Sequence, residues 1–160
     1  MLNTASAMEK PQVEYKMVYT TDIAEMNNNI EISDEEMLQV FLDAGIDKQI
    51  LKEAGFYDTA RYKAGVTKVV KYNAGYDIYL SQSTLKTIKS GGSTALAAVI
   101  TKLVGAPFAP IFSPLLAKVI NGLTPNPKGG MIFKLRIKKV YMGQYEGWVE
   151  MWVLDSYSYQ

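Results

Sequence analysis

At 160 residues the chain has the length of one domain, and it is long enough to fold without a metal or a disulfide. It contains no histidine and no cysteine. The best zinc ligands, a thiolate nucleophile and the usual general base near neutral pH are therefore missing. We expect a protein that is not an enzyme and that holds neither a cofactor nor a metal.

Charge is distributed unevenly along the chain, although the net charge is only +1. Residues 1–60 carry four lysines and twelve acidic residues, whereas residues 61–160 carry thirteen basic and four acidic residues. Such asymmetry indicates an acidic segment that covers or balances a basic one. We divide the chain into an acidic strand and helical segment at 8–60 and a basic α+β core at 61–160. The alternative is a single domain at 8–160.

The first residues end in the small-residue pattern Ala5-Ser6-Ala7, which is typical of a signal peptidase site. No basic start and no apolar stretch precede it in the sequence. We interpret residues 1–7 as a signal-peptide remnant, and expect a secreted or cell-surface protein. The lack of cysteine is equally compatible with the cytoplasm. Residues 13–19 alternate in part between apolar and polar and predict a strand.

Two short helices are predicted next. Ser33 and Glu36 form a capping box, and the first helix ends at Gly45. Asp47 caps a second helix that ends at Gly55. The pair superficially resembles a helix-turn-helix, but its acidic residues would repel phosphates, so we expect no nucleic-acid partner.

The rest of the chain predicts hairpins of both kinds. Helical turns are expected at 83–89, a helix from Ser93 to Val104, and another helix with Ser113 as N-cap and Pro114 at its first position. Strands are expected at residues 66–72, 76–80, 131–138 and 148–155. The fold class is therefore α+β: an acidic helix pair, then antiparallel β-hairpins flanking an apolar helical hairpin, in one sheet with helices packed on it.

The apolar helical hairpin at 93–122 is the first candidate surface. Each helix is roughly 12–18 Å long, too short for a bilayer core of about 30 Å. The hairpin is either ordinary core or a membrane-active element that inserts at the interface while two lysines reach anionic lipid. In composition it is similar to the cationic, Gly/Ala-rich helices of Gram-positive bacteriocins, without a signature motif. The membrane-binding residues would be Leu96, Ile100, Lys102, Leu103, Leu116 and Lys118.

The last hairpin is the second candidate surface. With a turn centred on Tyr145, Trp148 and Trp152 share a face with Arg136 and Lys138. Tryptophan beside basic residues suits a membrane interface, a glycan or a nucleic-acid backbone. The alternative is ordinary cross-strand pairing on a half-covered sheet.

Enzyme motifs are weak. The S-x-x-K pattern at 83–86 lacks the partner motifs that would support it. We therefore expect a non-enzymatic, exported bacterial protein that acts on membranes or the cell envelope, bacteriocin-like or pore-forming and thus antimicrobial. The alternative is a soluble binding, inhibitory or immunity-type module whose helical hairpin is core. The partner would be an anionic membrane surface, or an envelope component or protein.

Overall fold

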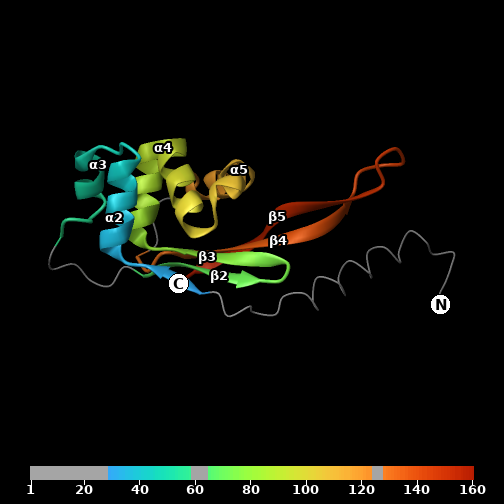
Figure 1. The fold of residues 1–160 in the computed structure, drawn as a ribbon, viewed down its shortest axis with the longest axis horizontal. Helices are drawn as coiled ribbons and strands as arrows, with labels where there is room; N and C mark the ends of the chain where they lie inside the picture. Colours follow the sequence, from blue (N-terminus) through green and yellow to red (C-terminus); the bar gives the residue numbers. More distant parts are fainter. Residues whose placement is uncertain (1–28, 59–64, 124–127) are drawn as a thin grey trace.

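A computed structural model describes residues 29–58, 65–123 and 128–160 (Figure 1). The strands β1 (Ile30–Ile32), β2 (Thr67–Tyr72), β3 (Gly75–Leu80), β4 (Met131–Tyr141) and β5 (Trp148–Tyr159) form one antiparallel sheet. The helices are α2 (Asp34–Asp43), α3 (Lys48–Glu53), α4 (Gln82–Leu103) and α5 (Ala109–Ile120), with the 3-10 turn η2 (Ala106–Phe108) before α5. The predicted α+β class is confirmed. The expected signal-peptide remnant at 1–7 and the strand at 13–19 lie outside the described residues.

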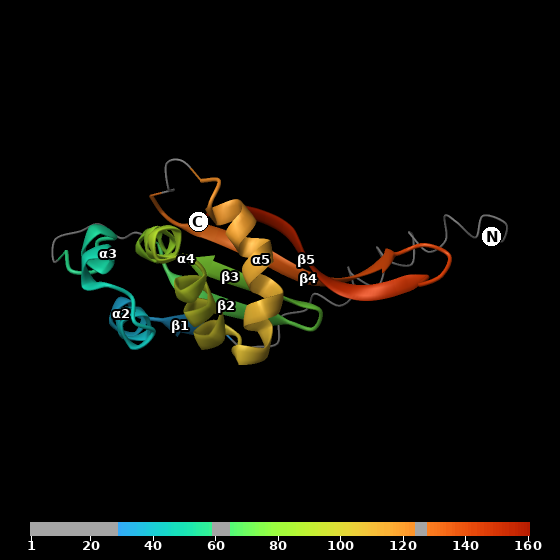
Figure 2. The same cartoon turned by 90° about the horizontal axis from the view of Figure 1, so that it is seen from above.

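The strand order in the sheet follows the order in the chain, so each strand pairs with the next. The helices lie over one face of the sheet, as Figures 1 and 2 show from two sides. The short strand β1 was not predicted. It pairs with β2, Ile32 opposite Thr67, which joins the acidic segment to the basic one within one sheet.

The two N-terminal helices have the predicted caps. The Glu36 amide donates to Ser33 Oγ at 3.1 Å, and the Gln49 amide donates to Asp47 Oδ1 at 2.7 Å. Met37 and Phe41 of α2 are buried in the same hydrophobic core as the sheet and the later helices. The acidic helices are therefore part of this core.

The first central helix contains both expected helical segments, at 83–89 and from Ser93, whereas the second begins earlier than expected. α4 starts after Ser81, whose side chain caps it, and continues to Leu103 with one break at Gly92 (φ 70°, ψ −150°). The expected start of α5 at Ser113-Pro114 is wrong, because η2 runs directly into α5 at Ala109. Pro110, in the first helical turn, takes the role that was expected of Pro114, which lies inside the helix.

The predicted helical hairpin packs its apolar side onto the sheet, with α2 and α3 beside α4. The apolar residues expected to face a membrane are only 0–4% exposed: Leu96, Ile100, Leu103 and Leu116. They pack in one cluster with the inward side chains of the sheet, such as Ile78 and Phe133. The first candidate surface is therefore not formed in this conformation. Among the described residues, no helix is long and apolar enough to cross a membrane.

Candidate functional site

The β4–β5 hairpin extends well beyond the helices and beyond the β2–β3 hairpin (Figures 1 and 2). β4 pairs with β3 only as far as Arg136, and from there its strand partner is β5 alone. The Met142 amide donates to the Gly147 carbonyl at 2.8 Å and closes the turn. Gly143 and Gly147 have φ angles of 109° and 65°, which residues other than glycine rarely adopt. We call residues 138–151 the arm.

The pairing within this hairpin differs from the prediction by one residue. Trp148 lies opposite Tyr141, and Trp152 lies opposite Ile137. The centre of the turn falls between Gln144 and Tyr145 rather than on Tyr145. Because side chains alternate between the two faces of a strand, a shift of one residue in the pairing places the side chains of β5 beside the opposite set of β4 side chains. The expected common face of the tryptophans with Arg136 and Lys138 is therefore wrong.

Trp152 lies at the base of the arm, within an aromatic cluster under α5. Its ring centroid is 5.0 Å from that of Phe112, 5.7 Å from that of Tyr76 and 5.9 Å from that of Phe108. Burial also raises the pKa of the Tyr76 hydroxyl above its ordinary value. Trp152 thus fixes β5 to the helix-covered body of the protein.

Arg136 is buried on the opposite face of the sheet, with only 5% of its surface exposed. Its Nη2 lies 2.9 Å from Asp77 Oδ1, in ion-pair contact rather than an aligned hydrogen bond. Its guanidinium lies over the Tyr72 ring at 4.9 Å, and the Tyr72 hydroxyl donates to Asp77 Oδ2 at 3.0 Å. Arg136 therefore does not present its charge to an external partner.

The three lysines of the predicted sites have different surroundings. Lys138 Nζ lies 2.5 Å from Asp155 Oδ1, so its charge is largely balanced within the sheet. Lys102 and Lys118 are exposed in the last turns of α4 and α5, where they favourably oppose the negative helix ends. The structure does not bring these lysines together with the tryptophans on one surface.

Exposed apolar side chains gather on the arm. Six of the eleven large hydrophobic residues that are exposed in the described part of the chain lie there: Tyr141, Met142, Tyr145, Trp148, Val149 and Met151. Tyr145 at the turn is 95% exposed, and the Tyr141 and Trp148 rings contact each other at 5.3 Å. The others are spread over β1, the turn after α3, α5 and the end of β5. Clustered apolar side chains on a projecting element are typical of an interaction site.

The arm carries charges of both signs that cancel. It contains two lysines, Lys138 and Lys139, and two glutamates, Glu146 and Glu150, and Lys139 lies directly opposite Glu150 in the ladder. Sequence reasoning identified only Trp148 and Lys138 among these residues. The signal for the other residues was the lack of apolar–polar alternation between 140 and 151, where apolar side chains occupy both faces.

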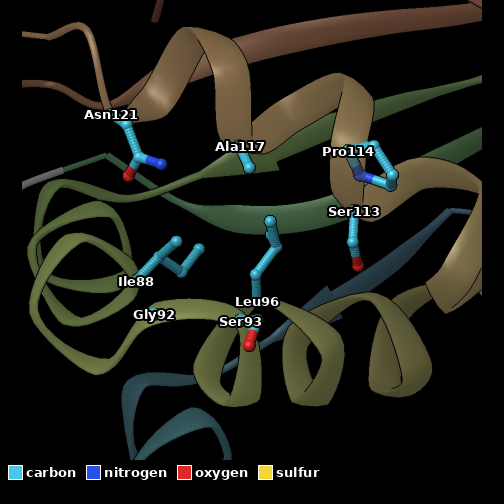
Figure 3. A pocket seen from close by; sticks show the side chains of 8 residues that line it. All are labelled: Ile88, Gly92, Ser93, Leu96, Ser113, Pro114, Ala117 and Asn121. Atoms are coloured by element: carbon cyan, nitrogen blue, oxygen red, sulfur yellow. The ribbon is translucent and has the colours of Figure 1, made fainter.

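A second feature is a partly enclosed cleft of about 300 Å³ between α4 and α5 (Figure 3). It is lined by Ile88, Gly92, Ser93, Leu96, Ser113, Pro114, Ala117 and Asn121. The Ser113 hydroxyl points from α5 towards α4, and its oxygen is buried without a hydrogen-bond partner. None of the lining side chains titrates, so the cleft offers no acid or base for catalysis. In the described ranges, no group of three or more acidic residues could hold a metal ion.

The arm is thus the candidate site, with Trp148 and Tyr145 as its most prominent side chains. Its geometry suits contact with another surface, and it shows no arrangement suited to chemical catalysis. Comparison with known protein families, with curated proteins and with solved structures finds no match for this chain.

Proposed function

We propose that this chain is a non-enzymatic protein-binding module that contacts a partner protein through the arm. The observation that carries the proposal is the concentration of exposed aromatic and apolar side chains on a hairpin that projects beyond the helices. Tyrosine, tryptophan and methionine are the residues enriched at protein interfaces. The rigid rings of tyrosine and tryptophan supply contact area at a low entropic cost.

The charges of the arm favour a protein partner over an anionic membrane. Attraction to anionic lipid is worth on the order of 1 kcal/mol for each basic residue near the surface. The arm has no net charge, and Lys138 is already paired with Asp155. Using the helical hairpin for insertion would require exposing core residues such as Ile100 and Leu116, which are fully buried.

Attachment to a membrane interface is a second candidate for the same arm. Tyr141, Tyr145 and Trp148 are aromatic side chains of the kind that collect at the headgroup level of a bilayer. This mode needs neither net charge nor opening of the core. A secreted or cell-surface location, proposed from the Ala5-Ser6-Ala7 pattern, would bring the arm to an envelope partner or to a lipid surface.

Site-specific crosslinking distinguishes these partners. A photoreactive amino acid at position 145 would report on the tip of the arm, and one at the exposed Ile111 of α5 serves as control. We expect a discrete protein adduct in the native cells from position 145 only. The adduct should disappear with the substitutions Trp148→Ser and Met151→Ser. Adducts of the same pattern from both positions would contradict the proposal.

Vesicle binding tests the second candidate. Full-length protein is sedimented with phosphatidylcholine vesicles and with vesicles that contain anionic phosphatidylglycerol. The protein-partner proposal predicts that the chain stays in the supernatant in both cases. Sedimentation that depends on Trp148 would favour the membrane interface instead.

A further inference from the structure

The outer edge of the sheet at β5 is unusually long. β5 runs for twelve residues, whereas β1 at the opposite edge has three. Among the described residues, no strand pairs with the outer side of β5. Proteins usually protect such edges with proline, lysine or a short strand. The sequence of β5 contains no proline and no lysine.

The backbone groups that point outward follow from the ladder. The Met142 amide donates to the Gly147 carbonyl, which fixes the alternation of hydrogen-bonded pairs along the hairpin. The Ile137 amide donates to the Ala74 carbonyl, away from β5, in agreement with this phase. Ile137 therefore belongs to a pair of the β4–β5 ladder that shares no hydrogen bond. Every second pair is of this kind, and the residues of β5 in these pairs direct their N–H and C=O groups away from β4. They are Trp148, Glu150, Trp152 and Leu154.

The length of this edge limits what can pair with it. The register shifts between Lys134 and Leu135 of β4, where Asp155 of β5 has no opposite residue. Such a bulge interrupts regular pairing on the outer side as well. The continuous edge therefore runs from Trp148 to Leu154. It fits an added strand of about seven residues.

We propose that this edge binds an extended, basic segment of the partner protein, which adds as a sixth strand beside β5. The inference rests on the proposed function and gives it a mode of binding, in which backbone hydrogen bonds supply affinity and side chains supply selectivity. β5 carries only the acidic Glu150 and Asp155, and Asp155 is paired with Lys138. Glu150 has Lys139 of β4 opposite it on the inner side, and a lysine or arginine of the added strand would give it a second favourable cross-strand pair on the outer side.

A second copy of the chain is a less suitable occupant. Two β5 strands side by side would bring together two Glu150 carboxylates and no basic side chain of β5, since each Asp155 is already paired with Lys138. Neither copy could then place a basic residue opposite Glu150. The charge pattern therefore distinguishes a basic strand from self-pairing.

Amide hydrogen exchange on the unmodified full-length protein tests the inference. The probe is a capped seven-residue peptide of alternating valine and lysine, and its control has glutamate in place of lysine. We expect the lysine peptide to slow exchange at the Glu150, Trp152 and Leu154 amides. The inward amides of Val149 and Met151 should already be protected without peptide. No added protection, or equal protection by both peptides, would overturn the inference.

A proline substitution gives an independent test. Glu150→Pro removes one outward amide and places the proline ring on the open edge, where proline is tolerated because the β4–β5 ladder is left intact. The matched control Glu150→Thr removes the same carboxylate but keeps the amide and suits a strand. We expect Glu150→Pro to weaken peptide binding by about tenfold or more, and Glu150→Thr by about fivefold at most. Equal affinities of the two variants would show that the edge is not used.

The occupant and the arm are tested separately. Sedimentation equilibrium should give a monomer for the unmodified chain. If the unmodified chain is a dimer and Glu150→Pro makes it a monomer, the occupant of the edge is a second copy of the chain and not a basic segment. If the adduct from position 145 persists in Glu150→Pro, the arm binds a protein by side chains alone, and the edge inference fails while the proposed function stands. If the adduct is absent but the lysine peptide protects the edge, the proposed function fails instead.

Discussion

The two tryptophans of β5 provide a direct test of how the hairpin divides between structure and binding. Trp152 packs against Phe112, Tyr76 and Phe108, whereas Trp148 contacts Tyr141 and is 41% exposed. We compare Trp152→Ala with Trp148→Ala. Both variants remove the same side chain from the same strand, so their difference reports on its surroundings.

The magnitude follows from the area that each side chain buries. A buried tryptophan removes about 150–250 Å² from water, at about 25 cal/mol per Å². Because Trp152 is mostly but not fully buried, its truncation should reduce the free energy of unfolding by roughly 3–4 kcal/mol, including its ring contacts. Trp148→Ala should reduce it by less than about 1 kcal/mol.

Urea unfolding followed by circular dichroism measures both values. The position-145 adduct should persist in folded Trp152→Ala and disappear in Trp148→Ala. If the two variants lose equal stability, the division between a structural base and a binding tip is refuted. If Trp152→Ala lowers the free energy of unfolding by less than about 1 kcal/mol, the aromatic cluster does not anchor β5.

Three further predictions concern the body of the protein. Asp77→Ala should reduce the free energy of unfolding by about 3–5 kcal/mol, because it leaves the buried Arg136 charge unpaired; the double variant Asp77→Leu, Arg136→Met should recover most of this in urea unfolding. Ser113→Ala should raise the free energy of unfolding by about 1 kcal/mol, because the hydroxyl oxygen is buried without a partner; an unchanged midpoint would indicate a water bound there. Removal of residues 1–60 should give an unfolded or aggregating product by circular dichroism and gel filtration, since Met37 and Phe41 belong to the common core, and a folded 61–160 fragment would contradict this.

Features set by a few neighbouring residues could be predicted from the sequence. The capping box at Ser33 and Glu36 and the Asp47 cap depend on side chains within three residues of the helix start. Strands β2 and β3 were predicted almost to the residue, and only Asn73 and Ala74 lie between their paired ends, Tyr72 and Gly75. These elements need no information about distant parts of the chain.

The errors arose where two local signals compete or where the decision is made by tertiary contacts. Two prolines, Pro110 and Pro114, can each begin a helix, and in the structure η2 leads directly into a helix that has Pro110 in its first turn. The arm exists because β4 is longer than its pairing with β3. That pairing ends at Arg136 of β4, whereas β4 continues to Tyr141. No local sequence pattern shows that β4 is longer than β3. Only the apolar residues on both faces of the arm indicated that this segment differs from the rest of the sheet.

The base of the β4–β5 hairpin and the arm should differ in how well they tolerate substitutions. Side chains at the base, such as Trp152 and Arg136, have partners in helices or neighbouring strands, so changes there reduce stability. The arm extends beyond the helices, and it carries exposed side chains such as Tyr145 and the contacting rings of Tyr141 and Trp148. Changes there alter the surface offered to a partner at little cost to folding. If the arm binds the proposed partner, this arrangement would allow binding selectivity to change independently of the fold.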